Sequence, residues 1–265
     1  LEGAALTRQW VYDGYDREVL SIDAMGNERW RSYDPNGNVV REWFEGELQD
    51  APGAADNVLM SDTRHVYDAM DRLIRTDARF FDPASGELLQ DGFSTRIQAY
   101  NGRSQLIRQV NDNGHETQFG YDAVGRRIFT RDAMGNETHY AYDANSNLIE
   151  KREVEQSGSG GIGEVYVTRY EYDGLDRRSR TIDSVGNVLG HFYDSRDNLV
   201  EERDALRVNP DAPGNRTFYD YDGLNRLVGI RHELSSNGTG GGEIAEVIEI
   251  GQEWDDTSRL IARTD

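Results

Sequence analysis

The stretch from Tyr121 to Asp143, YDAVGRRIFTRDAMGNETHYAYD, contains the pattern that decides the fold. It begins and ends on a tyrosine-aspartate pair, and the two tyrosines are 21 residues apart. A second motif, DAMGN, starts at Asp132, ten residues after Asp122. An Asp at the first position of a tight turn accepts hydrogen bonds from backbone amides two or three residues later, and a Gly at the fourth supplies a positive φ. The stretch therefore predicts two strands and two tight turns in every 21 residues.

The same pattern recurs along the whole sequence, in the order aromatic, Asp, three residues, Arg or Asn, and an apolar pair. The spacings between successive anchors are 21, 34, 33, 21, 21, 30, 21, 28 and 33 residues. Because 21 is the shortest and most frequent spacing, the longer ones are 21 plus an insertion. The structural repeat anchors are Tyr12, Asp13, Tyr33, Asp34, Tyr67, Asp68, Tyr100, Asn101, Tyr121, Asp122, Tyr142, Asp143, Tyr172, Asp173, Tyr193, Asp194, Tyr221, Asp222, Trp254 and Asp255.

The domain organisation follows from this spacing. We expect residues 1–265 to be a single YD-repeat region and a fragment of a larger protein. The insertions are predicted as loops because they carry Gly, Pro, Ser and Asn, as in SGSGGIG at residues 157–163. These loop insertions are expected near residues 41–61, 78–95, 151–165, 201–215 and 231–249.

The segments between the turns are short and rich in β-forming residues, as in Thr138-His139-Tyr140-Ala141-Tyr142. The predicted fold class is therefore all-β. In several repeats an aromatic residue also stands two positions before the anchor, so that both rings share one face of the strand. Stacked over successive repeats, these rings would form an aromatic ladder that fixes the strand register.

The combination of YD-x-x-G-R/N with D-x-x-G-N ten residues later resembles the YD-repeat, or Rhs-repeat, family over nearly the whole chain. That family includes bacterial Rhs polymorphic toxins, the B and C components of insecticidal toxin complexes, and teneurins. The resemblance implies an extended antiparallel β-ribbon of about ten 21-residue repeats, coiled as part of a hollow shell. In the bacterial members the shell encloses a toxic domain and ends in a self-cleaving segment. Residues 82–88, DPASGEL, match that segment only loosely, so no proteolytic activity is transferred.

Composition excludes several classes of function. The net charge of −20 repels phosphate backbones, so we expect no nucleic-acid partner. No run of about 18 apolar residues is present, which predicts no membrane insertion. The start at Leu1, without a signal-peptide pattern, suggests an internal piece of a longer protein. With the resemblance, this predicts a secreted or cell-surface location as part of a larger protein.

No residues stand out as a catalytic, cofactor-binding or metal site, and we predict no cofactor and no enzymatic activity. The G-x-G-x-x-G match at residues 158–163 precedes a strand pattern rather than a helix, which favours a hairpin tip over a dinucleotide site. Asn111-Asp112-Asn113-Gly114 lacks the alternating ligands of a calcium loop. A triad or a carboxylate pair needs closeness only in space, so the sequence leaves that possibility open.

The leading hypothesis is a structural shell segment that encapsulates a toxin or other cargo domain. Its partners would be the remainder of its own parent chain or another copy. The alternative is a carbohydrate- or receptor-binding adhesion module, in which exposed rings engage a glycan or a receptor protein. The two hypotheses differ in whether the aromatic face is buried or exposed.

Overall fold

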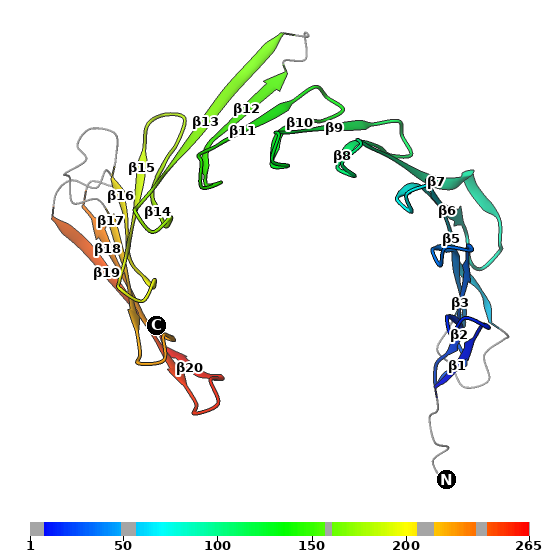
Figure 1. Cartoon of the computed structure of the whole chain (residues 1–265). Coiled ribbons are helices and arrows are strands. Elements are labelled where there is room, and N and C mark those ends of the chain that lie inside the picture. Colours follow the sequence, from blue (N-terminus) through cyan, green and yellow to red (C-terminus); the bar gives the residue numbers. More distant parts are fainter. Residues whose placement is uncertain (1–7, 49–56, 157–160, 206–214, 237–242, 265) are drawn as a thin grey trace, which may run out of the picture. The chain divides into compact units, whose positions relative to one another are not determined.

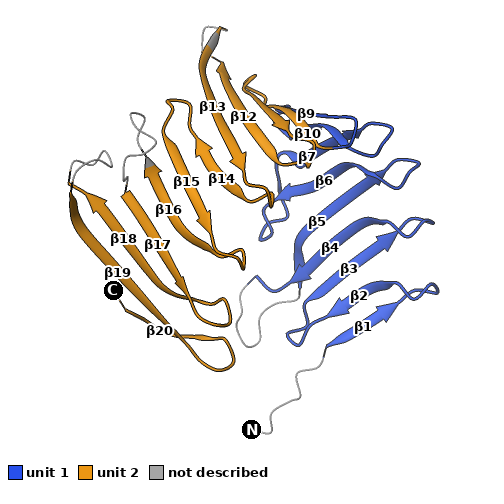
Figure 2. Ribbon diagram, turned by 60° about the vertical axis from the view of Figure 1, so that its left-hand side comes forward, with its two compact units in different colours: residues 1–125 blue, residues 126–265 orange. Residues whose placement is uncertain are grey.

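The computed structural model describes residues 8–48, 57–156, 161–205, 215–236 and 243–264, which form twenty β-strands (Figure 1). These described segments contain no helix, and so none that is long and apolar enough to cross a membrane. The all-β prediction is confirmed. The chain divides into two compact units, residues 1–125 and residues 126–265 (Figure 2).

Each unit is a run of consecutive strands. Unit 1 contains β1 (Gln9–Tyr12), β2 (Glu18–Ile22), β3 (Glu28–Tyr33), β4 (Val39–Gly46), β5 (Val58–Tyr67), β6 (Leu73–Phe81), β7 (Leu88–Tyr100), β8 (Leu106–Val110) and β9 (Glu116–Tyr121). Unit 2 contains β10 (Arg127–Arg131), β11 (Glu137–Tyr142), β12 (Leu148–Gln156), β13 (Ile162–Tyr172), β14 (Arg178–Ile182), β15 (Val188–Tyr193), β16 (Leu199–Ala205), β17 (Asn215–Tyr221), β18 (Leu227–Ser235), β19 (Ile244–Trp254) and β20 (Leu260–Thr264).

Within each unit every strand pairs antiparallel with its neighbour in sequence, so the ribbon is a simple meander. The register shifts by one residue immediately before the anchor aromatic. In the β11–β12 pair, for example, Ala141 faces Glu150 while Tyr142 faces Leu148. This bulge arises because the YD turn ends in a residue of positive φ, which adds one residue to the returning strand. It places each anchor at the mouth of its turn.

In the five segments predicted as loop insertions, the described residues are largely strand. In residues 78–95, strands β6 and β7 continue up to a short turn at Asp82–Gly86. The described parts of the other insertions likewise lengthen their hairpins, and residues 49–56, 157–160, 206–214 and 237–242 lie outside the described residues. The physical reason is that the two inserted segments pair with each other. Their backbone N–H and C=O groups then continue the hydrogen bonds already formed between the two strands of the hairpin.

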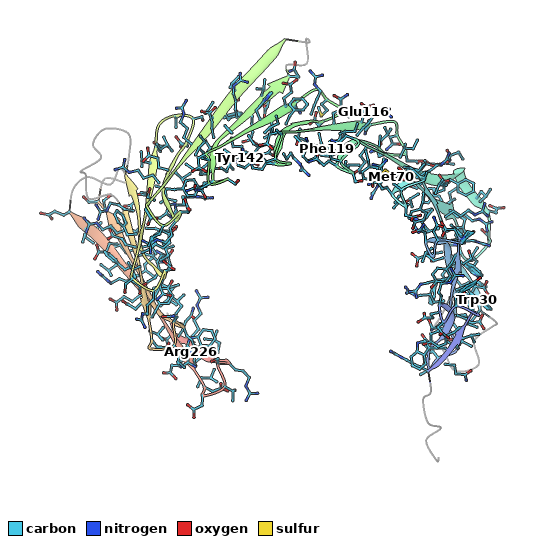
Figure 3. The ribbon with its side chains drawn as sticks, viewed as in Figure 1. Trp30, Met70, Glu116, Phe119, Tyr142 and Arg226 are labelled. Atoms are coloured by element: carbon cyan, nitrogen blue, oxygen red, sulfur yellow. The ribbon has the colours of Figure 1, made fainter. Side chains whose placement is uncertain are left out.

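The sheet is one layer thick in each unit, and side chains project from both of its faces (Figure 3). Among the described residues, the only buried apolar side chains are Leu20 and Val154, which are 9% and 5% exposed. No second layer of described structure covers either face. Hydrophobic burial between layers therefore contributes little here, and the strand ladders and turns must supply most of the order.

One local cluster in unit 1 is better packed. Trp30 and Trp43 face each other across β3 and β4, with parallel rings whose centroids are 5.6 Å apart. The Arg41 guanidinium lies 4.4 Å from the Trp43 ring centroid and pairs with Asp62, which is only 5% exposed. Its two bonds to Asp62 are 2.7 and 3.0 Å long and raise the pKa of Arg41. A buried carboxylate is thus neutralised in a bidentate pair.

We predict that Asp62→Asn lowers the free energy of unfolding of unit 1 by about 1–3 kcal/mol, because Arg41 loses its charged partner. Denaturant unfolding followed by tryptophan fluorescence measures this, since Trp10, Trp30 and Trp43 all belong to unit 1. The matched control in the same unit is Glu42→Gln, which breaks a 3.9 Å pair between the partly exposed side chains of Glu42 and Arg31 and should change stability by about 0.5 kcal/mol or less. Equal effects of the two substitutions would contradict the prediction.

Candidate functional site

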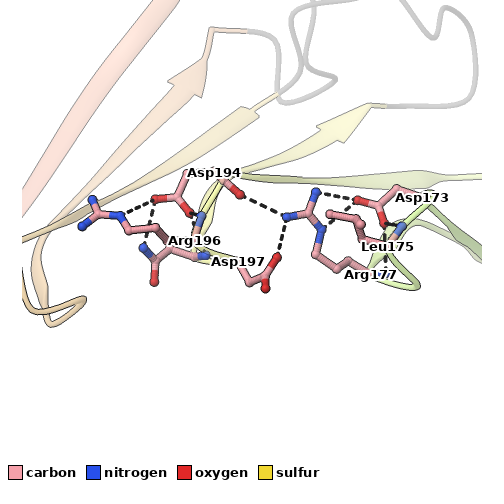
Figure 4. Close-up of polar contacts among 7 residues, drawn as sticks. Asp173, Leu175, Arg177, Asp194, Arg196 and Asp197 are labelled. Carbon is pink, nitrogen blue, oxygen red and sulfur yellow. Dashed lines mark hydrogen bonds and ion pairs between the residues drawn. The ribbon is translucent and has the colours of Figure 1, made fainter.

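The most regular site in the molecule is the YD turn, whose first side chain organises the four residues that follow. In the turn at Asp173, Oδ1 accepts the backbone N–H of Leu175 at 2.9 Å and that of Arg177 at 3.0 Å (Figure 4). Oδ2 accepts Arg177 Nε at 2.8 Å. The amides bonded are thus two and four residues after the Asp, rather than two or three. One carboxylate satisfies three donors and so closes the turn.

The fourth residue of the turn has a left-handed backbone. The sequence pattern favours Gly there, and the turns at Asp34 and Asp122 do use Gly37 and Gly125, with φ of 92° and 96°. The other YD turns place Asp, Ser or Asn at this position, for example Asp176 with φ of 60°. Asp and Asn tolerate this conformation better than other residues with a Cβ. The Gly of the pattern is therefore replaceable in this chain.

The fifth residue links each turn to the next turn on the same edge of the ribbon. Arg177 Nη1 donates to the carbonyl of Asp194 at 3.0 Å, and its guanidinium lies 4.8 Å from the Tyr193 ring centroid. We call this arrangement the arginine clasp. The clasps join Arg17 to Asp34, Arg72 to Asn101, Arg126 to Asp143, Arg177 to Asp194 and Arg226 to Asp255, with Nη1–O distances of 2.8–3.0 Å.

Between arginine clasps, an amide side chain makes the link instead. Asn147 Nδ2 donates to Asp176 Oδ1 at 2.7 Å. Asn38 reaches Asp71, Asn198 reaches Asn225, and Gln105 reaches the carbonyl of Gly125. Arginine and amide links thus alternate, so the structural period is two sequence repeats. The fifth residues read R, N, R, Q, R, N, R, N, R, R along the chain, a signal visible in the sequence that the 21-residue count does not use.

The anchor aromatics bond backward along the ribbon. Tyr172 Oη donates to the carbonyl of Leu148, the first residue after the preceding YD turn, at 2.9 Å. The same bond joins Tyr33 to Glu18, Tyr67 to Val39, Tyr100 to Leu73, Tyr121 to Leu106, Tyr142 to Arg127, Tyr221 to Leu199 and, through the indole N–H, Trp254 to Leu227. These anchors are half-buried, whereas Tyr12 is 56% exposed.

The predicted ladder of stacked anchor rings does not form among the described residues. Their aromatic contacts, such as Trp30–Trp43 and Phe129–His139, never join two successive anchors. The physical reason is spacing: successive anchors are two strands apart, roughly 9.6 Å, beyond the 4.5–7 Å of a ring pair. In the arginine clasps a guanidinium fills that gap, at 4.6 Å from the Tyr33 centroid for example. Arginine–aromatic contacts in alternate gaps therefore take the place of a ladder of stacked rings.

The turn carboxylates are held in their charged form. The side-chain hydrogen bond from Arg177 lowers the pKa of Asp173, and that from Asn198 lowers the pKa of Asp194, while partial desolvation opposes both. Backbone amides add to the effect in each turn. The same direction holds for Asp13, Asp23, Asp34, Asp68, Asp143, Asp183, Asp222 and Asp255.

A hydrogen-bonded relay in unit 2 brings together residue types that the sequence keeps apart. Thr181 Oγ1 lies 3.3 Å from His191 Nε2, and His191 Nδ1 lies 3.2 Å from Glu202 Oε1. Tyr219 Oη donates to Glu202 at 2.6 Å, and burial together with this bond raises the pKa of Tyr219. The order of groups is that of a catalytic triad.

The relay is better explained as cross-strand pairing than as catalysis. Threonine and histidine pair in the same way at Thr217–His232 (3.0 Å) and His65–Thr76 (3.3 Å), where no described carboxylate is paired with the histidine. A contact that recurs in both units reflects how side chains pair across the strands of this sheet, so it does not indicate a catalytic site. In the described part of the chain, no group of three or more His, Asp or Glu side chains is placed to hold a metal ion.

We predict that Arg72→Ala destabilises unit 1 more than Arg259→Ala destabilises unit 2. Arg72 bonds Asn101 in the next turn at 2.9 Å and lies 5.1 Å from the Tyr100 centroid, and we expect this link to contribute about 1–3 kcal/mol. Among the described residues Arg259 bonds only Asp255 and Thr257, and its side chain is 78% exposed. Thermal unfolding of both variants measures the contribution of the turn-to-turn link. Equal losses would show that the link adds nothing.

Acid should destabilise the folded ribbon over a defined range of pH. The folded-state pKa of the turn aspartates named above lies below the unfolded value of about 3.9, so their contribution to stability is complete above about pH 5. It is lost as the pH falls through the folded-state pKa. We expect the Tm to be flat near neutrality and to fall below about pH 4. In Asp194→Asn the loss of Tm should be largest at neutral pH and vanish in acid, whereas a pH-independent loss would contradict the assignment.

Known proteins resemble this chain in sequence or in fold. Teneurin-1 of Gallus gallus is 25% identical over 243 residues, which cover 85% of this chain and 8% of that protein. In the Photorhabdus luminescens Tc holotoxin pore, a similar fold covers 97% of this chain and 14% of that chain, with a TM-score of 0.58 and 12% identity. At that identity the similarity concerns the fold alone. The chain spans only a small part of the length of either protein.

The family model named Teneurin YD-shell matches residues 2–157, more than half of the chain. Those residues include the turns at Asp13, Asp34, Asp68, Asn101, Asp122 and Asp143, whose geometry is described above. The match and the repeating turn geometry agree, and the chain belongs to the teneurin YD-shell family.

Proposed function

We propose that the chain is a wall segment of a shell in a larger secreted or cell-surface protein of the Rhs type, and that this shell encloses a toxin or other cargo domain. The observation that carries the proposal is the single-layer sheet. A domain that functions by itself normally covers its sheet with a second layer, but each unit here leaves both faces uncovered by described residues. Such a sheet is suited to separating two spaces.

The turn edge gives such a wall its stiffness without a core. Arginine clasps and amide links connect the successive YD turns of each unit, from Asp13 to Gly125 in unit 1 and from Arg126 to Asp255 in unit 2. A quasi-one-dimensional stack needs neighbour contacts of this kind, because each hairpin touches only the next one. The net charge of −20 adds solubility to the exposed faces.

We further propose that the chain acts with the rest of its parent protein and has no catalytic role. The family is a structural shell domain, and the triad-like relay at His191 shares its Thr–His contact with the Thr–His pairs described above. A role as an adhesion module would require a ligand site outside the repeat pattern.

The test uses the complete open reading frame that contains these residues. We expect limited proteolysis to leave its non-repeat cargo segment intact while the shell is folded. Combined Arg72→Ala and Arg177→Ala substitutions should loosen the wall and expose that segment to cleavage. The matched control is Arg96→Ala, an exposed arginine of β7 that takes no part in a clasp.

The outcome that overturns encapsulation is cleavage of the non-repeat segments at the same rate in the folded wild-type protein as in the isolated segments. Protection that survives in the double variant would instead show that the clasps are not what holds the wall closed. Circular dichroism of each variant distinguishes loosening from complete unfolding.

A further inference from the structure

One YD turn begins with an asparagine where the other nine have an aspartate, and that residue, Asn101, is followed by Gly102. An Asn-Gly pair is chemically labile, because a glycine without a Cβ lets its backbone nitrogen approach the side-chain amide of the asparagine. The pair occurs four times in the chain, at residues 36–37, 101–102, 113–114 and 237–238, and the last of these lies outside the described residues. The three described pairs differ in their surroundings.

The first difference is the hydrogen bonding of the glycine nitrogen, which is the attacking atom. The Gly37 N–H donates to the carbonyl of Asp34 at 3.1 Å, and the Gly114 N–H donates to the carbonyl of Asn111 at 2.9 Å. Gly102 is the second residue of its turn rather than the fourth, and in the described part of the chain its N–H has no acceptor. Attack by Gly37 or Gly114 breaks a hydrogen bond of the turn, whereas attack by Gly102 breaks none.

The second difference is the environment of the side-chain carbonyl. Asn101 Oδ1 accepts the backbone N–H of Arg103 at 2.9 Å and that of Gln105 at 3.1 Å. Negative charge develops on this oxygen when a nucleophile adds to Cγ, and fixed backbone donors stabilise such a charge. No described donor is placed on Oδ1 of Asn36 or Asn113. The fourth YD turn therefore favours attack on its own first residue.

The turn also has room for the product. Asn101 Nδ2 donates to Gln105 Oε1 at 2.8 Å, and an aspartate at this position would require the Gln105 amide to turn over and donate instead. Asn38 shows that one amide nitrogen can serve both turns, because its Nδ2 donates to Asp34 Oδ2 at 3.0 Å and to Asp71 Oδ1 at 2.8 Å. Gln105 would keep its link to the next turn in the same way.

We propose that Asn101 is a deamidation site, at which loss of the side-chain amide gives the fourth YD turn the aspartate of the other nine. The Gly102 nitrogen attacks Cγ of Asn101. An N–Cγ bond forms, the Cγ–Nδ2 bond breaks, and Nδ2 leaves as ammonia with the proton of the Gly102 N–H. Water then opens the five-membered imide ring. Cleavage of the new N–Cγ bond gives aspartate, and cleavage of the backbone C–N bond gives isoaspartate.

The fold distinguishes the two products. An aspartate reproduces the three hydrogen bonds that Asp173 accepts in its own turn. An isoaspartate carries the main chain through the side-chain carbons, so its free carboxylate no longer stands where the turn amides point. Because isoaspartate can close the ring again, repeated opening in the folded chain enriches the aspartate form.

Peptide mapping by mass spectrometry, after incubation of the full chain in mildly alkaline buffer, tests the proposal. We expect Asn101 to convert about tenfold faster than Asn36 and Asn113, the factor that corresponds to one hydrogen bond broken in the slower reactions. The matched condition is the same incubation in urea, where unfolding removes the hydrogen bonds and the three rates should become similar. The aspartate share of the Asn101 product should be higher in the folded chain than in urea.

A variant without the labile pair separates the chemistry from the fold. In Gly102→Ala the added Cβ hinders the attack, and conversion of Asn101 should slow about tenfold or more. This alanine fits the turn, because nothing lies within 4 Å of a Cβ built on Gly102 and other YD turns have Ala69, Ala123 and Ala144 at the same position. The matched control is Gly174→Ala, the same change in a turn that begins with aspartate, and it should leave the rate at Asn101 unchanged.

The product is tested directly with Asn101→Asp. We expect its Tm at neutral pH to equal or exceed that of the wild type, with the difference vanishing below about pH 4 as the new carboxylate is protonated. A lower Tm at neutral pH would show that aspartate does not fit this turn. Equal conversion of the three asparagines in the folded chain, or an unchanged rate in Gly102→Ala, would overturn the proposal. Neither result bears on the protease protection of a cargo segment, so this site and the shell role are tested separately.

Discussion

Hydrogen bonds accepted by the first side chain of each YD turn, an aspartate in nine turns and Asn101 in the tenth, set the geometry on which the ribbon depends. One carboxylate accepts two backbone amides and the side chain of the fifth residue, which fixes the turn and the direction of that residue. Only because the guanidinium of Arg177 is held in this way can it reach the carbonyl of Asp194 and the ring of Tyr193. The local turn thus determines the long-range contact.

This arrangement explains how a sheet with almost no buried apolar side chain keeps its order. Every YD turn except the last contributes a forward link, through an arginine or an amide. Eight of the anchor rings contribute a backward hydrogen bond to a strand carbonyl. The links are individually modest, because their groups are partly exposed and screened by solvent. Because these links are numerous, together they stabilise the ribbon in place of a hydrophobic core. Stability is consequently spread along the edge of the ribbon and is sensitive to acid through many carboxylates at once.

Repetition also separates structural chemistry from binding chemistry. A residue required in every repeat, such as the turn aspartate, is explained by geometry. The same reasoning removes the Thr181–His191–Glu202 relay from the candidates, since Thr–His pairs recur at Thr217–His232 and His65–Thr76.

The sequence by itself determined the all-β class, the anchors and the turn positions, because Asp at a turn and β-formers between turns act within a few residues. It also contained the alternation of Arg and Asn at the fifth position, although a count of dipeptides does not reveal it. Only the tertiary structure decided that a guanidinium, rather than a second ring, fills the space between anchors, because strand spacing sets that distance. It likewise turned the predicted loops at 78–95 into paired strand, and it placed Trp10, Arg29 and Phe44 in one row, since cross-strand register joins residues far apart in sequence.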